Sequence, residues 1–149
     1  MARKYVVDGS QNAAASTTVI GITSATTIRP VLYDLVFGSA ATPADQAFNM
    51  QVNRYTAAGT GTTVTPVAID PGDPAALAAA KENHTGEPTY TSAAVVLSFS
   101  VNQQATFRWV VPPDEGIVMP ATANNGLGLR FVTVSGGTAL SEATAYYEE

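Results

Sequence analysis

Two acidic and two basic residues within one segment offer the most evident chemistry in this sequence. The segment "TFRWVVPPDEGIVMPATANNGLGLRF", residues 106–131, contains the acidic pair Asp114 and Glu115 and the cations Arg108 and Arg130. Two carboxylates could perform acid–base chemistry on a glycoside, and two guanidinium groups could clamp an anion. Neighbouring residues of one tight turn do not flank a sugar bond together, because glycosidases hold their two carboxyl groups about 5 Å or more apart across the substrate. We therefore interpret Asp114 and Glu115 as part of a solvated turn.

The remaining polar motifs lack the partners that catalysis or metal binding would need. His84 is the only His, so a His-based metal cluster is excluded, and a Ser–His–Asp triad lacks its Gly-x-Ser-x-Gly elbow. "GTGT" and "SGGT" lack the Lys and the strand–helix context of a phosphate-binding loop. "DPGDP", residues 70–74, lacks the closing Glu and the further oxygen ligands of a calcium loop. The sequence therefore predicts a protein that is not an enzyme, with no catalytic, cofactor-binding or metal-binding residues and no small-molecule substrate.

The composition restricts the partners of the chain. The 149 residues include only 13% charged residues, about half of the usual share, and the net charge is −5. Seven scattered cations argue against nucleic acid, and no apolar run approaches the roughly 20 residues of a membrane span. The chain has no Cys, and its start contains no apolar stretch of signal-peptide length, which predicts synthesis in a cytoplasm. A surface so poor in charge is weakly protected against association, so we expect partner proteins to cover part of it.

Alternation of apolar and polar residues predicts the elements that position these side chains. Val31, Tyr33, Leu35 and Phe37 share one face of such a segment, and Trp109 shares its face with its apolar neighbours at i−2 and i+2 and is expected to be buried. Turns rich in Gly, Asn and Pro separate the segments. The clear segments are 30–37, 47–55, 91–101, 105–111 and 127–131, and weaker ones lie near 17–23, 62–69 and 139–147.

These segments predict an all-β domain of about eight strands in a two-sheet antiparallel sandwich that is jelly-roll-like. An immunoglobulin-like topology is the rival, although its Cys–Trp–Cys marker is absent. One short helix is expected near 74–82, with Asp73 as N-cap, Pro74 at the first helical position and an Ala-rich run after it. Residues 1–16 show no core pattern and predict an extended N-terminal arm that becomes ordered on a partner, and 17–149 form the single sandwich domain.

Several residues are candidates for partner contact. In the arm these are Arg3, Lys4 and Tyr5. Arg108 and Arg130 lie opposite the apolar faces of their strands, where they would bind an anion or an acidic partner if the strands are close, or else shield the sheet in solvent. Near the C-terminus, Tyr146 and Tyr147 are interface residues by type, although they would equally close the last strand.

The block "FRWVVPPDEGIVMPATANNGLGLRF", together with the alternating strands from 17 to 147, carries a family resemblance. Its notable features are residues 108–109, 113–117, Pro120 and 124–127. With these features the chain resembles the small jelly-roll capsid decoration (cement) proteins of tailed bacteriophages. The resemblance implies a non-enzymatic virion protein that binds the major capsid protein on the capsid exterior, often as trimers at three-fold axes, and stabilises the shell. It also implies assembly in a host bacterial cytoplasm, and it supplies no catalytic residues.

Two other classes of protein use a similar sandwich. One is a phage tail or fibre component that binds a receptor. The other is a carbohydrate-binding module, which needs exposed aromatic rings on a sheet face or loop. The expected burial of Trp109 disfavours the second class, whereas no feature of the sequence separates the first class from a capsid protein.

Overall fold

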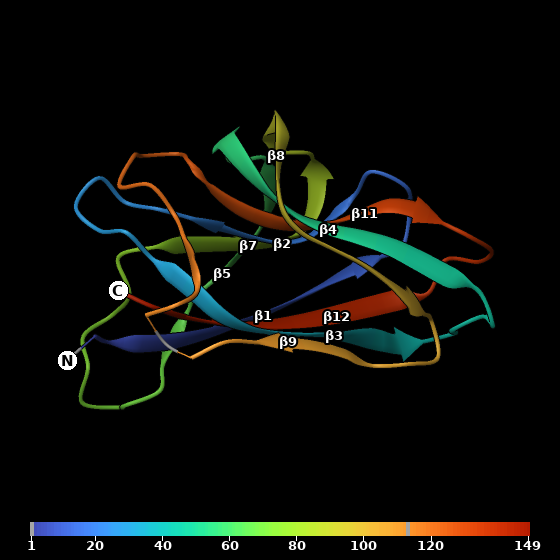
Figure 1. Cartoon of the computed structure of the whole chain (residues 1–149), viewed down its shortest axis with the longest axis horizontal. Helices are drawn as coiled ribbons and strands as arrows, with labels where there is room; N and C mark the ends of the chain where they lie inside the picture. The colour runs from blue at the N-terminus through green and yellow to red at the C-terminus, as the bar shows by residue number, and fades with distance from the viewer. Residues whose placement is uncertain (1, 113) are drawn as a thin grey trace.

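The computed structural model describes residues 2–112 and 114–149, and within that part of the chain it consists of β-strands and their connections (Figure 1). The same residues include no helix that could cross a membrane. The strands are β1 (Lys4–Asn12), β2 (Thr18–Thr23), β3 (Val31–Ala41), β4 (Ala47–Ala57), β5 (Thr60–Val64), β6 (Val67–Ala68), β7 (Ala79–Gly86), β8 (Thr89–Asn102), β9 (Phe107–Val110), β10 (Ile117–Val118), β11 (Gly126–Val134) and β12 (Leu140–Glu148).

The strands form two antiparallel sheets packed as a sandwich, which confirms the predicted fold class. Sheet A has the order β10-β3-β12-β1-β6, with β9 also paired to β3, and sheet B has the order β5-β7-β2-β11-β4-β8. Four nested pairs run through both sheets: β1 with β12, β2 with β11, β3 with β9, and β4 with β8. This nesting, closed by the crossover pairs β12·β3 and β11·β4, is the jelly-roll arrangement of two Greek keys.

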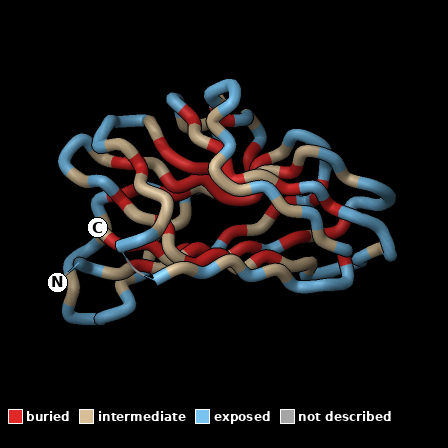
Figure 2. Tube along the Cα trace, viewed as in Figure 1, coloured by how far each residue is buried: buried red, intermediate tan, exposed pale blue. Residues whose placement is uncertain are grey.

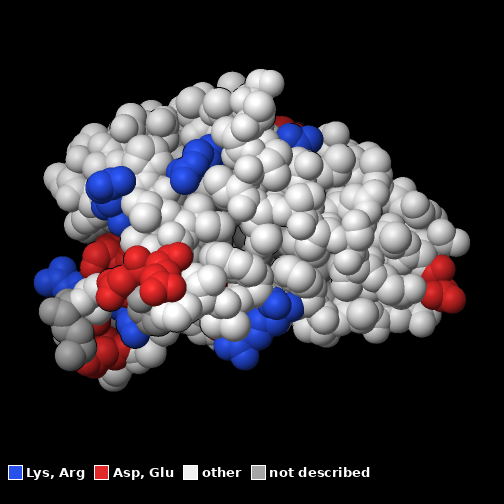
Figure 3. Space-filling model, viewed as in Figure 1, with Lys and Arg blue, Asp and Glu red and all other residues white. Residues whose placement is uncertain are grey.

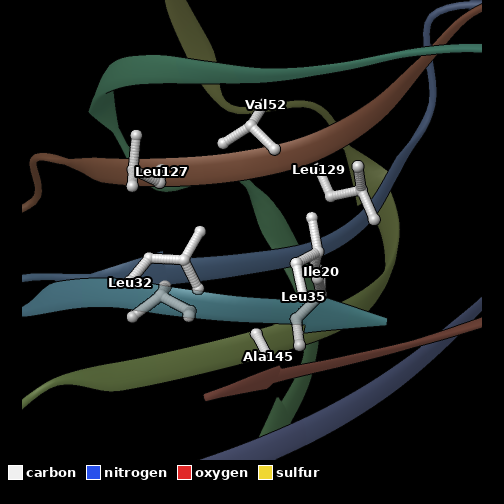
Figure 4. Close-up of a pocket in the computed structure, with 8 residues that line it drawn as sticks. Ile20, Leu32, Leu35, Val52, Leu127, Leu129 and Ala145 are labelled. Carbon is white, nitrogen blue, oxygen red and sulfur yellow. The ribbon is translucent and has the colours of Figure 1, made fainter. Parts of the chain in front are cut away.

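The core lies between the sheets and is built from the inward positions of the alternating strands (Figure 2). Phe37, Phe48 and Phe131 pack edge to face, with ring centroids 5.0–6.0 Å apart. The core also contains an apolar cavity of about 10 Å³ (Figure 4). Because its lining carries no polar side chain that could hold a water, we treat this cavity as a packing defect. Its lining residues are Ile20, Ile22, Leu32, Leu35, Val52, Leu127, Leu129 and Ala145.

The predicted helix over 74–82 is wrong. Residues 74–78 have no regular structure, and the Ala-rich run continues into β7, which pairs with β2 and with β5. Asp73 does not cap a helix; its N–H donates to Asp70 O at 3.0 Å in a turn. A helix of two to three turns is marginal alone, whereas a strand between two partners has its backbone hydrogen bonds supplied from both sides. The small side chains of Ala78 and Ala80 also fit the crowded core.

The prediction of a free N-terminal arm over 1–16 is wrong for the residues of β1. This strand lies between β12 and β6, and the side chains of Tyr5 and Val7 are fully buried. The sequence hides this pattern because the next two inward positions are Gly9 and Gln11, which are not apolar signals. Gly9 is needed there because a Cβ would lie 2.9 Å from the Cβ of Glu82. The sandwich domain therefore begins at the N-terminal strand.

One register shift also changes which side chains point inward. On β3, Tyr33 is an extra residue opposite Tyr146 and Tyr147, and this bulge turns Leu32 into the core and leaves Tyr33 half-buried, against the expected face. On the neighbouring β9, Trp109 packs against the core but is only half-buried, less than the sequence predicts.

Candidate functional site

Arg108 is held by a carboxylate of the neighbouring strand. Its Nε donates to Asp34 Oδ1 at 3.0 Å and its Nη2 donates to Asp34 Oδ2 at 2.6 Å, a bidentate pair on the outer face of sheet A. The Asp34 side chain is 8% exposed, whereas that of Arg108 is 61% exposed. The pair raises the pKa of Arg108, mainly through these hydrogen bonds. Arg108 therefore shields a buried carboxylate and is committed to it in the isolated chain.

Arg108 and Arg130 do not form a common anion site. Arg108 lies on β9 of sheet A, whereas Arg130 lies on β11 of sheet B. The side chain of Arg130 points away from the core and covers the ring of Tyr90 at 4.6 Å from the centroid, which is cation–π geometry. Of the two alternatives for these cations, a shared anion site is therefore wrong, because each guanidinium group occupies the outer face of a different sheet.

The two cations of the N-terminus lie beside the C-terminus and the long connection that contains β6. Arg3 and Glu149 exchange backbone hydrogen bonds of 3.2 and 2.9 Å, and Lys4 Nζ lies 5.7 Å from the ring centroid of Tyr33. A hollow of about 200 Å³ opens here, lined by Ala2, Arg3, Lys4, Ile69, Asp70 and Asp73. Its cations and carboxylates balance each other, so the hollow does not select a ligand of one charge sign.

Two of the three tyrosines expected at an interface are core residues. Tyr5 and Tyr147 are opposite each other on β1 and β12, fully buried and stacked with centroids 5.6 Å apart. Tyr5 donates its hydroxyl to Pro74 O at 3.1 Å, whereas the buried hydroxyl of Tyr147 has no partner among the described residues. Burial raises the pKa of Tyr147 far above the ordinary range for tyrosine. Only Tyr146, which is half-buried and points outward, is available to a partner.

The acidic pair occupies a turn, as expected, but one member has a structural partner. Asp114 adopts a positive φ of 75° and donates its backbone N–H to Glu148 Oε1 at 3.0 Å. Glu115 N–H donates to Pro112 O at 3.1 Å and closes the turn. Burial is the main cause that raises the pKa of Glu148; the side chain of Asp114 also raises it, whereas the hydrogen bond from the Asp114 backbone N–H and the charge of Lys4 oppose the shift. The arrangement is a capped turn against a buried carboxyl group, and neither Asp114 nor Glu115 lines the core cavity or the hollow beside the N-terminus.

A polar cluster on sheet B was not found from the sequence. The segment 84–90 leaves β7 at one side of the sheet and crosses its outer face to enter β8 at the other. It lies directly on glycines: a Cβ on Gly128 would be 2.2 Å from the Tyr90 hydroxyl. Glu87 accepts hydrogen bonds from the backbone N–H and the hydroxyl of Thr18. Glycines at alternate positions of β11 are the sequence signal that could have predicted this crossing.

His84 belongs to this same cluster. Its Nδ1 lies 3.2 Å from Thr18 O, which also accepts from Gln11 Nε2 at 3.3 Å. Burial is the main cause that lowers the pKa of His84, so the ring is neutral near pH 7. The described residues contain no group of three or more His, Asp or Glu side chains that could hold a metal ion. His84 therefore has a role in joining β1, β2 and β7.

The short loops at one end of the sandwich are joined by a single side chain. Gln103 is 2% exposed; its Nε2 donates to Ser135 O at 2.7 Å and to Gly136 O at 3.1 Å. Its Oε1 accepts from Ala44 N–H at 2.9 Å. Three loops are thereby fixed to one another. Together with residues 13–17 they form a surface that we call the loop end: 13–17, 42–46, 103–106 and 135–139.

The loop end contains one charged residue, Asp45, whose Oδ1 accepts from Asn102 Nδ2 at 2.7 Å. The rest of this end carries small uncharged side chains, and in Figure 3 the end opposite the termini shows one red patch on a white surface. A rigid surface without free cations and with one tethered carboxylate can be buried by a partner at a small desolvation cost.

Comparisons of the chain with protein-family models, curated proteins and solved structures found no match.

Proposed function

We propose that this chain is a non-enzymatic structural protein of a bacteriophage virion that decorates the outside of the capsid and stabilises it. The proposal combines the resemblance of the block 107–131 to capsid decoration proteins with the jelly-roll strand order. In this proposal the partner is the major capsid protein, the protein assembles in the host cytoplasm, and three copies associate around a three-fold axis, as in the proteins that it resembles.

The observation that carries the proposal furthest is the loop end, which has a single charged residue and is fixed by the hydrogen bonds of Gln103. A decoration protein must bury a fixed surface against a shell without first ordering mobile loops, because ordering would subtract from the binding free energy. Gln103 provides that order before binding, through three hydrogen bonds to two other loops. We therefore propose the loop end as the surface that meets the shell. Contact through uncharged groups also predicts that binding changes little with salt.

Sedimentation with empty shells of the cognate major capsid protein tests this proposal. We expect the protein to pellet with shells at both low and high salt. Ala105→Glu places a carboxylate on the loop end and should weaken pelleting about tenfold or more, because the charge would be buried without a partner. The matched control is Ala123→Glu, an equally exposed alanine in the connection between β10 and β11 at the other end, which should bind normally.

Two results would contradict the proposal in different ways. A protein that never pellets with shells at either salt concentration would reject capsid decoration, and a tail or receptor-binding role would then become the leading interpretation. Normal pelleting of Ala105→Glu together with loss in Ala123→Glu would keep the function but move the contact to the end that carries the termini.

A further inference from the structure

The edges of the two sheets are protected unequally. An exposed strand edge carries unpaired N–H and C=O groups and can pair with another chain unless it is short, charged, interrupted by proline or covered. At the edges of sheet A, β6 and β10 have two residues each, and β9 has four and contains Arg108. Beyond β6, the edge of β1 is covered by Glu82, whose Oε2 accepts from Ser10 N–H at 2.6 Å. In sheet B, β5 has only five residues.

The remaining edge, β8, has none of these protections over its second half. It is 14 residues long, and the sequence from Pro88 to Phe107 contains no charged residue. Its first half is irregular, with a positive φ of 57° at Ala93 and register shifts opposite Asn53 and Tyr55. From Leu97 to Asn102 the pairing with β4 is regular. Figure 1 shows β8 along the side of the sandwich that faces the viewer, and the middle of that side is white in Figure 3.

The hydrogen-bond pattern identifies the backbone groups that face outward. Gln103 N–H donates to Gln46 O at 2.9 Å, which fixes the alternation of the β4·β8 ladder. In an antiparallel ladder every second residue points its N–H and C=O to the partner strand, so Leu97, Phe99 and Val101 bond to β4. Ser98 and Ser100 therefore direct their backbone N–H and C=O groups away from the sheet. Asn102 is the next residue in phase, but its C=O already accepts from Ala105 N–H at 2.9 Å.

We infer that β8 is a self-pairing edge, which binds β8 of a second copy of this chain in antiparallel orientation about a two-fold axis at Phe99. In this register Ser98 lies opposite Ser100 of the second copy, so the two residues with free backbone groups on each side satisfy one another. A two-fold contact uses the same patch on both copies, which requires a patch that does not repel itself. The uncharged stretch meets that requirement, although each chain carries a net charge of −5.

A second copy is favoured over an unrelated peptide because the side chains along the regular half of β8 are either small or directed into the core. Leu97, Phe99 and Val101 pack against the core, and Ser98 and Ser100 are small. Recognition therefore comes from the main chain and from matched length, which another β8 supplies. Such a contact buries less than the roughly 1,000 Å² of a stable interface, so we expect a dimer in concentration-dependent equilibrium. This β8 contact does not depend on the proposed capsid function. If the chain also associates around a three-fold axis, the two contacts together would give an assembly of six copies.

Sedimentation velocity over a range of concentrations tests the pairing with the full chain alone. We expect the wild-type protein to form assemblies with an even number of copies as concentration rises. Ser98→Lys places two cations at diagonal positions beside the two-fold axis and should weaken association about tenfold or more, because long like-charged side chains at diagonal positions of paired strands repel. The control is Thr62→Lys, the same charge on the exposed β5 edge at the opposite side of sheet B, which should associate as the wild type does.

A cross-linking experiment tests the register and remains informative if Ser98→Lys unfolds. The chain has no Cys, so introduced thiols are the only ones present. A mixture of Ser98→Cys and Ser100→Cys chains should form disulfide-linked dimers faster than either variant alone. A wild type that stays monomeric or only trimeric at all concentrations would overturn the inference, and so would a mixture that cross-links no faster than the single variants. Because no capsid is present, failure here leaves the capsid proposal intact, and failure to pellet with shells leaves this pairing intact.

Discussion

The two ends of the sandwich differ in how their connections are built. The loop end consists of four short connections with one carboxylate among them, three of them fixed by Gln103. The opposite end contains both termini, the connections 24–30 and 114–125, and the long connection 65–78 between β5 and β7, which includes β6 (Figure 1). Most of the red and blue surface in Figure 3 lies on that side, beside the termini. Charged residues at or next to these segments are Arg3, Lys4, Arg29, Asp70, Asp73, Asp114, Glu115, Glu148 and Glu149.

The loops at the two ends of the sandwich are held in place in two different ways. At the loop end, one buried amide satisfies backbone groups from two other loops, so order depends on a single side chain. At the end with the termini, order is distributed over many weak contacts. Glu149, for example, accepts from Leu77 and Ala78 N–H at 3.0 and 2.8 Å. Exposed apolar side chains of the long connection, Val67 and Leu77 among them, also lie on this end. We therefore expect single substitutions to disturb the loop end more strongly.

The largest effect should come from Gln103→Ala. The change removes three hydrogen bonds of a side chain that is 2% exposed and leaves backbone groups of the 42–46 and 135–139 loops without these partners. We expect the free energy of unfolding to fall by about 1–3 kcal/mol. Chemical denaturation measures this change, and hydrogen exchange should increase in both loops. A variant with unchanged stability and exchange would show that the loops do not depend on this side chain.

A matched pair of tyrosine substitutions should give the intermediate effect, at the end with the termini. Tyr5→Phe deletes a hydroxyl that donates to Pro74 O and should cost about 0.5–1.5 kcal/mol. Tyr147→Phe deletes the neighbouring buried hydroxyl, which has no partner among the described residues, and should be neutral or stabilising. Tyr5→Phe should therefore lower the thermal midpoint, whereas Tyr147→Phe should leave it unchanged or raise it. Equal losses in both variants would mean that the stacked rings, and not their hydroxyls, determine the contribution.

The smallest effect is a pH dependence at Glu148. Burial raises the pKa of Glu148, so the folded state favours the protonated form. The contribution of protonated Glu148 to the free energy of unfolding is fully present below the pKa of this group in the unfolded chain. It is lost as the pH rises through the pKa of Glu148 in the folded chain. Glu148→Gln keeps an acceptor for Asp114 N–H without the charge. It should raise the thermal midpoint at about pH 7 and change it little at about pH 4.

The control for this pH dependence is Glu115→Gln, an exposed carboxylate in the same turn as Asp114, which should change neither thermal midpoint. A Glu148→Gln variant that gains as much at the acidic pH as at the neutral one would exclude titration of Glu148 as the cause.

The sequence alone determined the class of fold. Period-two alternation in segments such as 47–55 and 127–131 requires sheets with one buried face, which is the pattern typical of antiparallel strands. Two such faces can bury their apolar side chains only against each other, which is a sandwich. The solvated turn at Asp114 and Glu115 was predictable for the same local reason, because Pro and Gly fix the backbone around it.

The tertiary structure decided what local signals could not. An Ala-rich run that predicts a helix became β7 because β2 and β5 supply hydrogen bonds on both sides. A segment without an apolar pattern became β1 because β12 and β6 pair with it, and its inward positions include a glycine beside Glu82 and a buried glutamine that bonds to Thr18 O. Of the candidate partner residues, Tyr5 and Tyr147 became core, while Arg108 and Arg130 were separated onto different sheets. Strand pairing joins residues that are distant in the sequence, so which face a side chain occupies depends on register and strand order, and these are properties of the whole sandwich.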